Sequence, residues 1–488
     1  MRGKSLSRRT LEGFAWMFAG AGGQALLRIV VLAVLARLLT PTDFGVIGAA
    51  MTVVALADIL STIGIAPAIV QMPKIGRADL RTAFTISVLS GLTAAALVYA
   101  AAPGIASLFR IPAVEPVVRA LAVVFVIRGC ALVAEAKLQR EMRFRALSAI
   151  GIASYTVGYG GVAIGLAVAD FGIWSLVLGQ IVQIAIASAC FLICGRHAAV
   201  PLLDREVVVR LFGFGAGITL TGLGNYVALN VDQFIVGRAL GPAVLGLYNR
   251  AYTILMQPVN LLGAVGDKVL FPALASIQSE GDRLARAYCR AVGLIALATI
   301  PLSLFLILHA RECVLLLLGP QWGELVIPFQ ILVASLFFRT AYKISSTLLR
   351  SRGMIYRLAF WQWLYAGSVC LGALGGVPYG IAGVSVGVGL AILLTFILGL
   401  WFSRQACPLP IAEIATTILR YVWLALLVNA PLLAKPFLMA EAGAIVQLAI
   451  GAAAVGTMTL AAWFAVPGLF GAEREWLRSA VGRARGSR

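Results

Sequence analysis

Fourteen long apolar segments limit the folds that this chain can adopt. Each segment runs for about 18 to 25 residues, the length that a helix needs to cross roughly 30 Å of hydrocarbon, whereas barrel strands would be shorter and would alternate polar and apolar residues. Hydrophobic residues make up 61% of the chain and charged residues 12%, which is outside the range of soluble proteins. The sequence therefore predicts an all-α polytopic membrane protein with about fourteen transmembrane helices.

The loops between these segments carry positive charge unevenly. The expected spans cover residues 11–36, 43–66, 80–102, 114–136, 147–169, 172–194, 208–231, 243–267, 285–309, 324–348, 358–376, 379–402, 414–434 and 441–466. If the N-terminus is cytoplasmic, the inner segments carry 26 Lys and Arg residues and the outer segments six. Cytoplasmic loops are enriched in these residues, so we expect a multi-pass protein of the bacterial inner membrane with both termini in the cytoplasm.

Several motifs recur at a nearly constant distance along the chain. The pattern Arg-x3-Pro-x3-Gly at 37–45 returns at 238–246, an offset of 201. Two further matches relate 140–145 to 352–357 at offset 212, and 171–173 to 379–381 at offset 208. This repetition predicts a duplicated unit of about six spans.

The duplication suggests a domain plan. Because six is an even number, the two copies would have the same orientation in the membrane. We expect an N-terminal lobe over 1–200, a parallel C-terminal lobe over 201–405, and two additional spans with a basic cytoplasmic tail over 406–488. The cavity between two such lobes is the default substrate path.

A few cations lie inside the expected spans, where a charge costs at least about 2.5 to 3.5 kcal/mol unless it faces a polar cavity. Arg339 and Lys343 share one helix face, and an anionic ligand or water would relieve their repulsion. We hypothesise that five such residues line the cavity and bind a phosphate or pyrophosphate group: Arg28, Arg128, Arg250, Arg339 and Lys343. The alternative for each is a structural ion pair with a carboxylate such as Asp58, Glu135 or Asp232.

Other polar residues within the spans are candidates for ion coupling or for lining the cavity. They are Gln24, on the same helix face as Arg28, and Asp58, Asn225 and Asp232. Asn225 and Asp232 fall on one helix face. A proton or sodium site there would supply coupling, but an ion pair with a nearby arginine explains Asp232 equally well.

The chain shows no sign of catalytic chemistry. No loop exceeds roughly 15 to 20 residues, and there is neither a Gly-rich phosphate loop ending in Gly-Lys-Ser/Thr nor a paired-histidine metal motif. We therefore expect no enzyme activity, no catalytic or metal-binding residues and no cofactor. The net charge of +19 lies mostly in short loops that border membrane helices, which argues against a nucleic-acid partner.

Four stretches carry a family resemblance. They are LARLLTPTDFGVIGAA at 35–50, GIAPAIVQ at 64–71, VDQFIVGRALGPAVLGLYNRAYTILMQP at 231–258 and LGPQWGE at 318–324. These resemble the polysaccharide-export branch of the multidrug/oligosaccharidyl-lipid/polysaccharide exporter superfamily, and the resemblance covers nearly all of the first twelve spans.

The resemblance implies a flippase for polyprenyl-pyrophosphate-linked oligosaccharide repeat units, used in exopolysaccharide, capsule or O-antigen synthesis. Such proteins work by alternating access of two six-helix lobes and receive the pyrophosphate-sugar head in a cationic cavity. The implied partners are the lipid-linked oligosaccharide, membrane lipids and a polysaccharide polymerase.

Three alternatives stay open. A multidrug/cation antiporter of the same superfamily would need an acidic cavity, against which the buried cations argue. A peptidoglycan lipid-precursor flippase would have a similar fold and a cationic cavity, and essentiality of the gene would distinguish it. A membrane enzyme acting on lipid-linked sugars would normally show a long outer loop, which this chain lacks.

Overall fold

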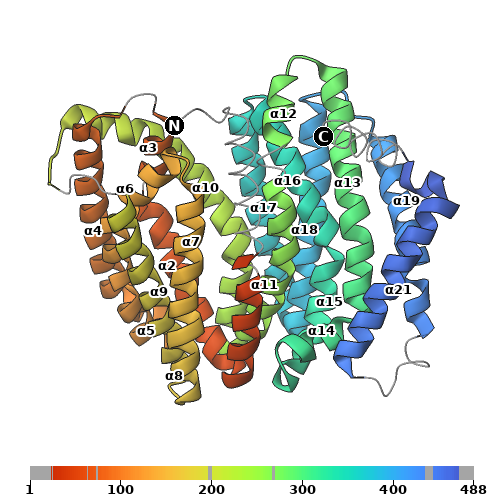
Figure 1. Cartoon of the computed structure of the whole chain (residues 1–488), viewed down its shortest axis with the longest axis horizontal. Helices are drawn as coiled ribbons and strands as arrows, with labels where there is room; N and C mark the ends of the chain where they lie inside the picture. The colour runs from red at the N-terminus through yellow and green to blue at the C-terminus, as the bar shows by residue number, and fades with distance from the viewer. Residues whose placement is uncertain are drawn as a thin grey trace, which may run out of the picture. The chain divides into compact units, whose positions relative to one another are not determined.

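The structure is a computed structural model, which describes residues 23–24, 26–62, 64–72, 75–195, 200–265, 270–434 and 443–471. These residues are helical almost throughout, and none of them belongs to a β-strand. The predicted all-α fold class is confirmed (Figure 1). In a bilayer this is expected, because a helix satisfies its backbone hydrogen bonds within the segment that crosses the lipid.

Each expected span overlaps at least one helix. The first half of the chain contains a helix over 26–38, followed by α2 (Pro41–Thr62), α3 (Ile65–Gln71), α4 (Arg77–Phe109), α5 (Val114–Leu121), α6 (Val123–Arg140), α7 (Phe144–Tyr155), the π-helical η1 (Thr156–Ala163), α8 (Ile164–Val168), α9 (Ile173–Cys194) and α10 (Arg205–Leu240). The second half contains α11 (Pro242–Val265), α12 (Phe271–Ser276), α13 (Gly281–Leu308), α14 (Ala310–Leu317), η3 (Pro320–Leu325), α15 (Val326–Ala334), α16 (Leu336–Ser351), α17 (Ile355–Gly376), η4 (Val377–Tyr379), α18 (Gly380–Arg404), α19 (Ile411–Asn429), η5 (Ala430–Ala434), α21 (Ala444–Ala465) and η6 (Pro467–Phe470).

The described residues contain nine helical segments that are long and apolar enough to cross a membrane, or ten if the bent pair α15 and α16 counts as one span. One of the nine, Tyr356–Arg404, consists of α17 and α18. These two helices run antiparallel, because Gly372 lies against Gly387 and Gly376 against Gly383. The number fourteen therefore stays a prediction.

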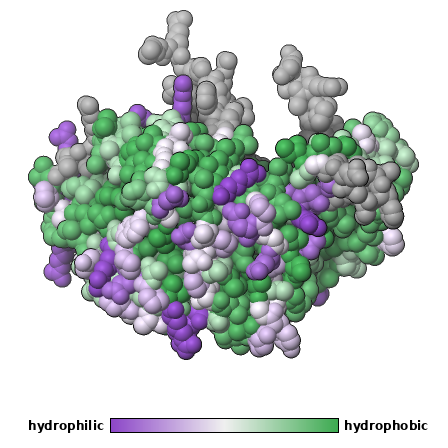
Figure 2. Space-filling model, turned by 90° about the horizontal axis from the view of Figure 1, so that it is seen from below, coloured by the Kyte–Doolittle hydropathy of each residue, from purple (hydrophilic) through white to green (hydrophobic). Residues whose placement is uncertain are grey.

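The chain forms two compact units, Met1–Asn249 and Arg250–Arg488. Within the first unit, α6 packs between α4 and α9, and within the second, α16 packs against α13 and α18 (Figure 1). The second unit also holds the C-terminal helices, with α19 on α13 and α21 on α19. Many large apolar side chains remain on the outside, and Figure 2 shows them over much of one face.

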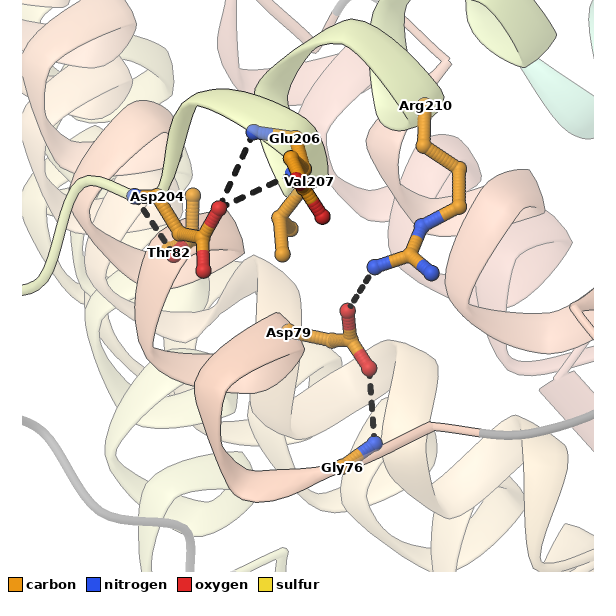
Figure 3. A network of polar contacts seen from close by, with 7 residues as sticks. All are labelled: Gly76, Asp79, Thr82, Asp204, Glu206, Val207 and Arg210. Carbon is orange, nitrogen blue, oxygen red and sulfur yellow. Dashed lines mark hydrogen bonds and ion pairs between the residues drawn. The ribbon is translucent and has the colours of Figure 1, made fainter.

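Polar contacts attach the start of α10 to the start of α4 (Figure 3). The Asp79 carboxylate accepts a hydrogen bond from the backbone of Gly76 at 2.7 Å and pairs with Arg210 of α10 at 2.6 Å. Asp204 caps the first turn of α10, and its backbone N–H donates to the Thr82 hydroxyl of α4 at 3.3 Å. These contacts help to explain why α10 belongs to the first unit, although the expected lobe boundary precedes it.

The turn before α2 is fixed by a reciprocal cap. Thr40 and Asp43 exchange side-chain and backbone hydrogen bonds of 2.7 to 3.2 Å, and Pro41 begins the helix. This is the capping-box arrangement, which satisfies backbone donors that a helix start leaves open. The repeated motif also begins a helix with proline, since α11 starts at Pro242, directly after Gly241 in a left-handed conformation (φ 86°).

The two copies of the motif meet at their glycines. A Cβ atom on Gly45 would lie 1.7 Å from the carbonyl oxygen of Pro242, and one on Gly246 would lie 1.8 Å from that of Pro41. The Cβ atom added to Gly45 would lie 3.1 Å from the backbone nitrogen of Gly246, and the one added to Gly246 would lie 3.0 Å from the backbone nitrogen of Gly45. The duplicated turns therefore pack against each other symmetrically, backbone to backbone.

The duplication is visible in backbone angles elsewhere. Gly172 (φ 51°, ψ −130°) and Gly380 (φ 67°, ψ −157°) occupy equivalent turns before or at the start of a helix, in agreement with the offset of 208. Arg143 and Met354, which precede α7 and α17, share φ −82° and ψ 51°, an offset of 211. The sequence match at offset 212 is therefore one residue out of register with the backbone.

Candidate functional site

Arg339 of α16 is the most deeply buried of the candidate cations, with 4% of its surface exposed. Its guanidinium donates to the hydroxyls of Tyr252 and Tyr365 and to the sulfur of Met256, and it lies 4.7 Å from the centre of the Tyr252 ring. No carboxylate among the described residues lies within ion-pair distance of it. Its positive charge is therefore stabilised by neutral dipoles and an aromatic face.

Lys343 lies one turn further along α16 and also points toward α11. Its ammonium group donates to the backbone carbonyl of Val259 at 3.4 Å, and it lies so close to Gly263 that a Cβ atom there would be 2.5 Å from Nζ. The structure thus brings Arg339 and Lys343 together against the same helix, as their spacing predicted. Two like charges on one buried helix face favour an anion or water between them.

Arg128 of α6 has a carboxylate partner. Its Nη1 lies 2.7 Å from Oδ2 of Asp58 on α2, and the two side chains are 44% and 22% exposed. Glu135, two turns along α6, interacts electrostatically with both. Arg128 and Asp58 therefore form an ion pair in this structure, which is the contact that we named as the alternative to phosphate binding by Arg128.

Gln24 and Arg28 lie against α7, in agreement with their expected common face. Gln24 is next to Gly151, and the Arg28 guanidinium lies 5.7 Å from the centre of the Tyr155 ring. Tyr155 stacks on Tyr159 at the start of η1. A π-helical segment of eight residues is unusual, and such segments occur frequently at functional sites.

Asp232 of α10 is buried, with 1% of its surface exposed. It accepts hydrogen bonds from the Tyr248 hydroxyl at 2.7 Å and from the backbone of Gln233 at 2.9 Å. Asn249 donates to the Gln233 side chain at 3.1 Å, which extends this network along α11. Asn225 is half-buried on the same helix but does not take part in these contacts.

The candidates thus fall into groups within each unit. The first unit holds Gln24 with Arg28, Asp58 with Arg128, and Asp232 with its tyrosine; the second holds Arg339 with Lys343, and the half-buried Arg250 at its first position. Sequence reasoning missed Tyr252 and Tyr365, because the 87 and 26 residues that separate them from Arg339 leave no periodic signal. In the described part of the chain, no three His, Cys, Asp or Glu side chains could hold a metal ion together.

Known structures share this fold. The inward closed lipid II flippase MurJ superposes with a TM-score of 0.71 over 91% of this chain and 97% of MurJ, at 13% identity. An inward-facing multidrug-resistance MATE transporter superposes with a TM-score of 0.62 over 81% of this chain and 95% of its own, at 19% identity. The protein therefore has the helical fold that MurJ and this MATE transporter share.

The sequence comparisons identify the family of the protein within this fold. Residues 34–327 match the model of the polysaccharide biosynthesis protein family, and the chain belongs to that family. Among curated proteins it is similar to the lipopolysaccharide biosynthesis protein WzxC of Escherichia coli (26% identical, covering 81% of this chain and 80% of WzxC). It is also similar to the teichuronic acid biosynthesis protein TuaB of Bacillus subtilis (24%, 85% and 86%) and the succinoglycan biosynthesis transport protein ExoT of Rhizobium meliloti (23%, 76% and 76%).

Proposed function

We propose that this protein is a flippase that moves polyprenyl-pyrophosphate-linked oligosaccharide repeat units across the bacterial inner membrane by alternating access of its two repeats, 1–200 and 201–405. The family and the relatives support this proposal, because WzxC, TuaB and ExoT are all named for polysaccharide biosynthesis, and ExoT also for transport. The protein would supply exopolysaccharide, capsule or O-antigen synthesis without enzymatic activity of its own, and a polysaccharide polymerase would use its product.

The observation that carries the proposal is the buried cation Arg339 with Lys343 beside it. Among the described residues, the side chains that Arg339 contacts by hydrogen bonds are neutral, although guanidinium groups bind carboxylate or phosphate most strongly. A charged side chain inside a membrane span is a candidate for a functional role, because burying it in the span costs free energy. The pyrophosphate that joins an oligosaccharide to its prenyl chain would supply an anionic ligand of this kind to Arg339.

A peptidoglycan lipid-precursor flippase is the second candidate. The similarity to the lipid II flippase MurJ favours it, but that similarity is one of fold at 13% identity. The sequence relatives with 23 to 26% identity are named for other polysaccharides. Growth of a strain that lacks the gene separates the two, because loss of peptidoglycan-precursor transport stops growth.

The substrate site is tested by replacing Arg339 and Lys343 together with alanine in a strain that lacks the chromosomal copy. We expect secreted or surface polysaccharide to be lost, because the pyrophosphate would have no cation in this part of α16, while an immunoblot shows near-normal protein in the membrane. Lys343→Ala alone tests the site without removing the tyrosine contacts of Arg339. Arg350→Ala is the matched control, since Arg350 lies on the same helix near its cytoplasmic end.

Normal export by the double variant would remove these two residues from the substrate site. Loss of export with Arg350→Ala as well would indicate a general defect of α16 and would also contradict a specific role. The orientation that we propose, with both termini in the cytoplasm, is tested separately by cysteine labelling, as described in the Discussion.

A further inference from the structure

Most of the Arg128 guanidinium has no hydrogen-bond partner among the described residues, even though the residue forms an ion pair. Only Nη1 contacts Asp58, and no other described residue forms a hydrogen bond with Nε or Nη2. The Arg128 side chain as a whole is 44% exposed, so the protein does not enclose it. Arginine binds phosphate best through two parallel N–H···O bonds, and the edge formed by Nε and Nη2 is open for this geometry.

Two carboxylates compete for this one cation. Glu135 lies seven residues after Arg128 on α6 and therefore on nearly the same helix face, and it interacts electrostatically with both Arg128 and Asp58. Its own hydrogen bond comes from Gln139, at 3.3 Å. The three charged groups together carry a net charge of −1, so an arriving phosphate adds to an excess of negative charge.

We propose that Asp58 is the resident counter-ion of Arg128, which competes with the phosphate of the substrate and so limits how tightly that phosphate binds. When phosphate occupies the open edge of the guanidinium, the Arg128–Asp58 attraction weakens. When Asp58 regains Arg128, it favours release of the phosphate. This inference rests on the proposed flippase function and adds a specific role for Asp58, which otherwise is only a candidate for ion coupling.

A transporter needs such a device because binding must be strong enough for the substrate to enter and weak enough for it to leave. Several arginines around one pyrophosphate would hold it tightly if nothing competed with it. A carboxylate tethered 2.7 Å from one of them is always present, whereas a free anion would have to diffuse in. Asp58 therefore sets an upper limit on the affinity at this one arginine.

Binding of two probes to the purified full-length protein in lipid nanodiscs tests the inference. Geranylgeranyl pyrophosphate represents a lipid-linked phosphate, and inorganic pyrophosphate represents the free anion; calorimetry gives Kd for each. Asp58→Asn should lower Kd by about fivefold, the upper value for removing a partly exposed ion pair. Arg128→Lys should raise Kd, because an ammonium group lacks the planar donor edge.

Asp79→Asn is the matched control. It removes a carboxylate that also pairs with an arginine in the first unit, at 2.6 Å from Arg210, and should leave both Kd values unchanged. In an Arg128→Gln background, Asp58→Asn should have no further effect, because the cation for which it competes is gone. That double variant removes both charges of the ion pair together, so it keeps the test valid if Asp58→Asn alone folds poorly.

The outcomes separate the two proposals. If the wild type binds the prenyl probe but Asp58→Asn does not bind it more tightly, the counter-ion role is wrong and the flippase proposal stands. If the wild type binds neither probe, both proposals fail together. Tightening with the prenyl probe alone assigns the site to lipid-linked phosphate, whereas tightening with both probes shows that the phosphate group suffices; either result supports the role of Asp58.

Discussion

Replacing Gly45 with alanine should destabilise the protein, because the new methyl group has no space. Its carbon would lie 1.7 Å from the carbonyl oxygen of Pro242, whereas a carbon and a carbonyl oxygen in contact are about 3.3 Å apart or more. The obstacle is backbone, so a side-chain rotation cannot relieve it. The starts of α2 and α11 would have to separate by about 1.5 Å at this point.

The expected magnitude follows from two opposing effects. Overpacking of a close contact typically costs about 1 to 3 kcal/mol. Alanine recovers about 0.5 to 1 kcal/mol as a better helix former than glycine. Because the obstacle is backbone, we place the overpacking cost in the upper part of its range, at about 2 to 3 kcal/mol. The net loss for Gly45→Ala is then about 1 to 2.5 kcal/mol, with a similar loss for Gly246→Ala, whose new atom would meet Pro41 at 1.8 Å.

The two changes should not add. Once one methyl group has separated the helices, the second finds part of its space already made, so the double variant should lose less than the sum of the single variants. Unfolding of the full-length protein by increasing mole fractions of SDS, followed by tryptophan fluorescence, gives the free energies. Gly104→Ala is the control, because no atom lies within 4 Å of the added carbon and α4 should gain stability.

Two results would refute this reasoning. If Gly45→Ala is as stable as wild type, the glycine contact between the repeats does not form in the protein. If both single variants lose stability and the double variant loses the full sum, Gly45 and Gly246 act independently and the reciprocal packing is wrong.

The remaining predictions concern the second unit, the membrane orientation and the reactivity of one cysteine. Gly399→Ala should lower the unfolding free energy by about 1 to 3 kcal/mol in the same SDS assay, because the new carbon would lie 2.5 Å from the fully buried ring of Trp361; wild-type stability would contradict this packing. A membrane-impermeant maleimide should label Ala243→Cys in intact cells but not Tyr356→Cys, which is exposed and which we place on the cytoplasmic side; the reverse pattern would contradict the orientation. After the cells are permeabilised, the native Cys407, in the loop after α18, should still react slowly in both variants, because burial raises the pKa of its thiol to about 11 and little thiolate forms at neutral pH.

The sequence alone was sufficient to predict the helices, because in a bilayer the requirement for helix formation depends only on the segment itself. An apolar segment of about 20 residues must satisfy its own backbone hydrogen bonds, so its length and composition identify it as a helix whatever its neighbours are. The repeat was also predictable, since the turns at Pro41 and Pro242 preserve the residues that start a helix. The common face of Arg339 and Lys343 followed from helical periodicity in the same way.

Only the tertiary structure decided which partners the polar residues find. Arg128 pairs with a carboxylate 70 residues earlier in the chain, and Arg339 lies among tyrosines 87 and 26 residues away. In the sequence both arginines are cations inside an apolar segment, yet in the structure one has a carboxylate partner and the other has neutral hydrogen-bond partners. The reason is that a side chain's electrostatic environment depends on which helices pack together, and that information is spread over the whole chain.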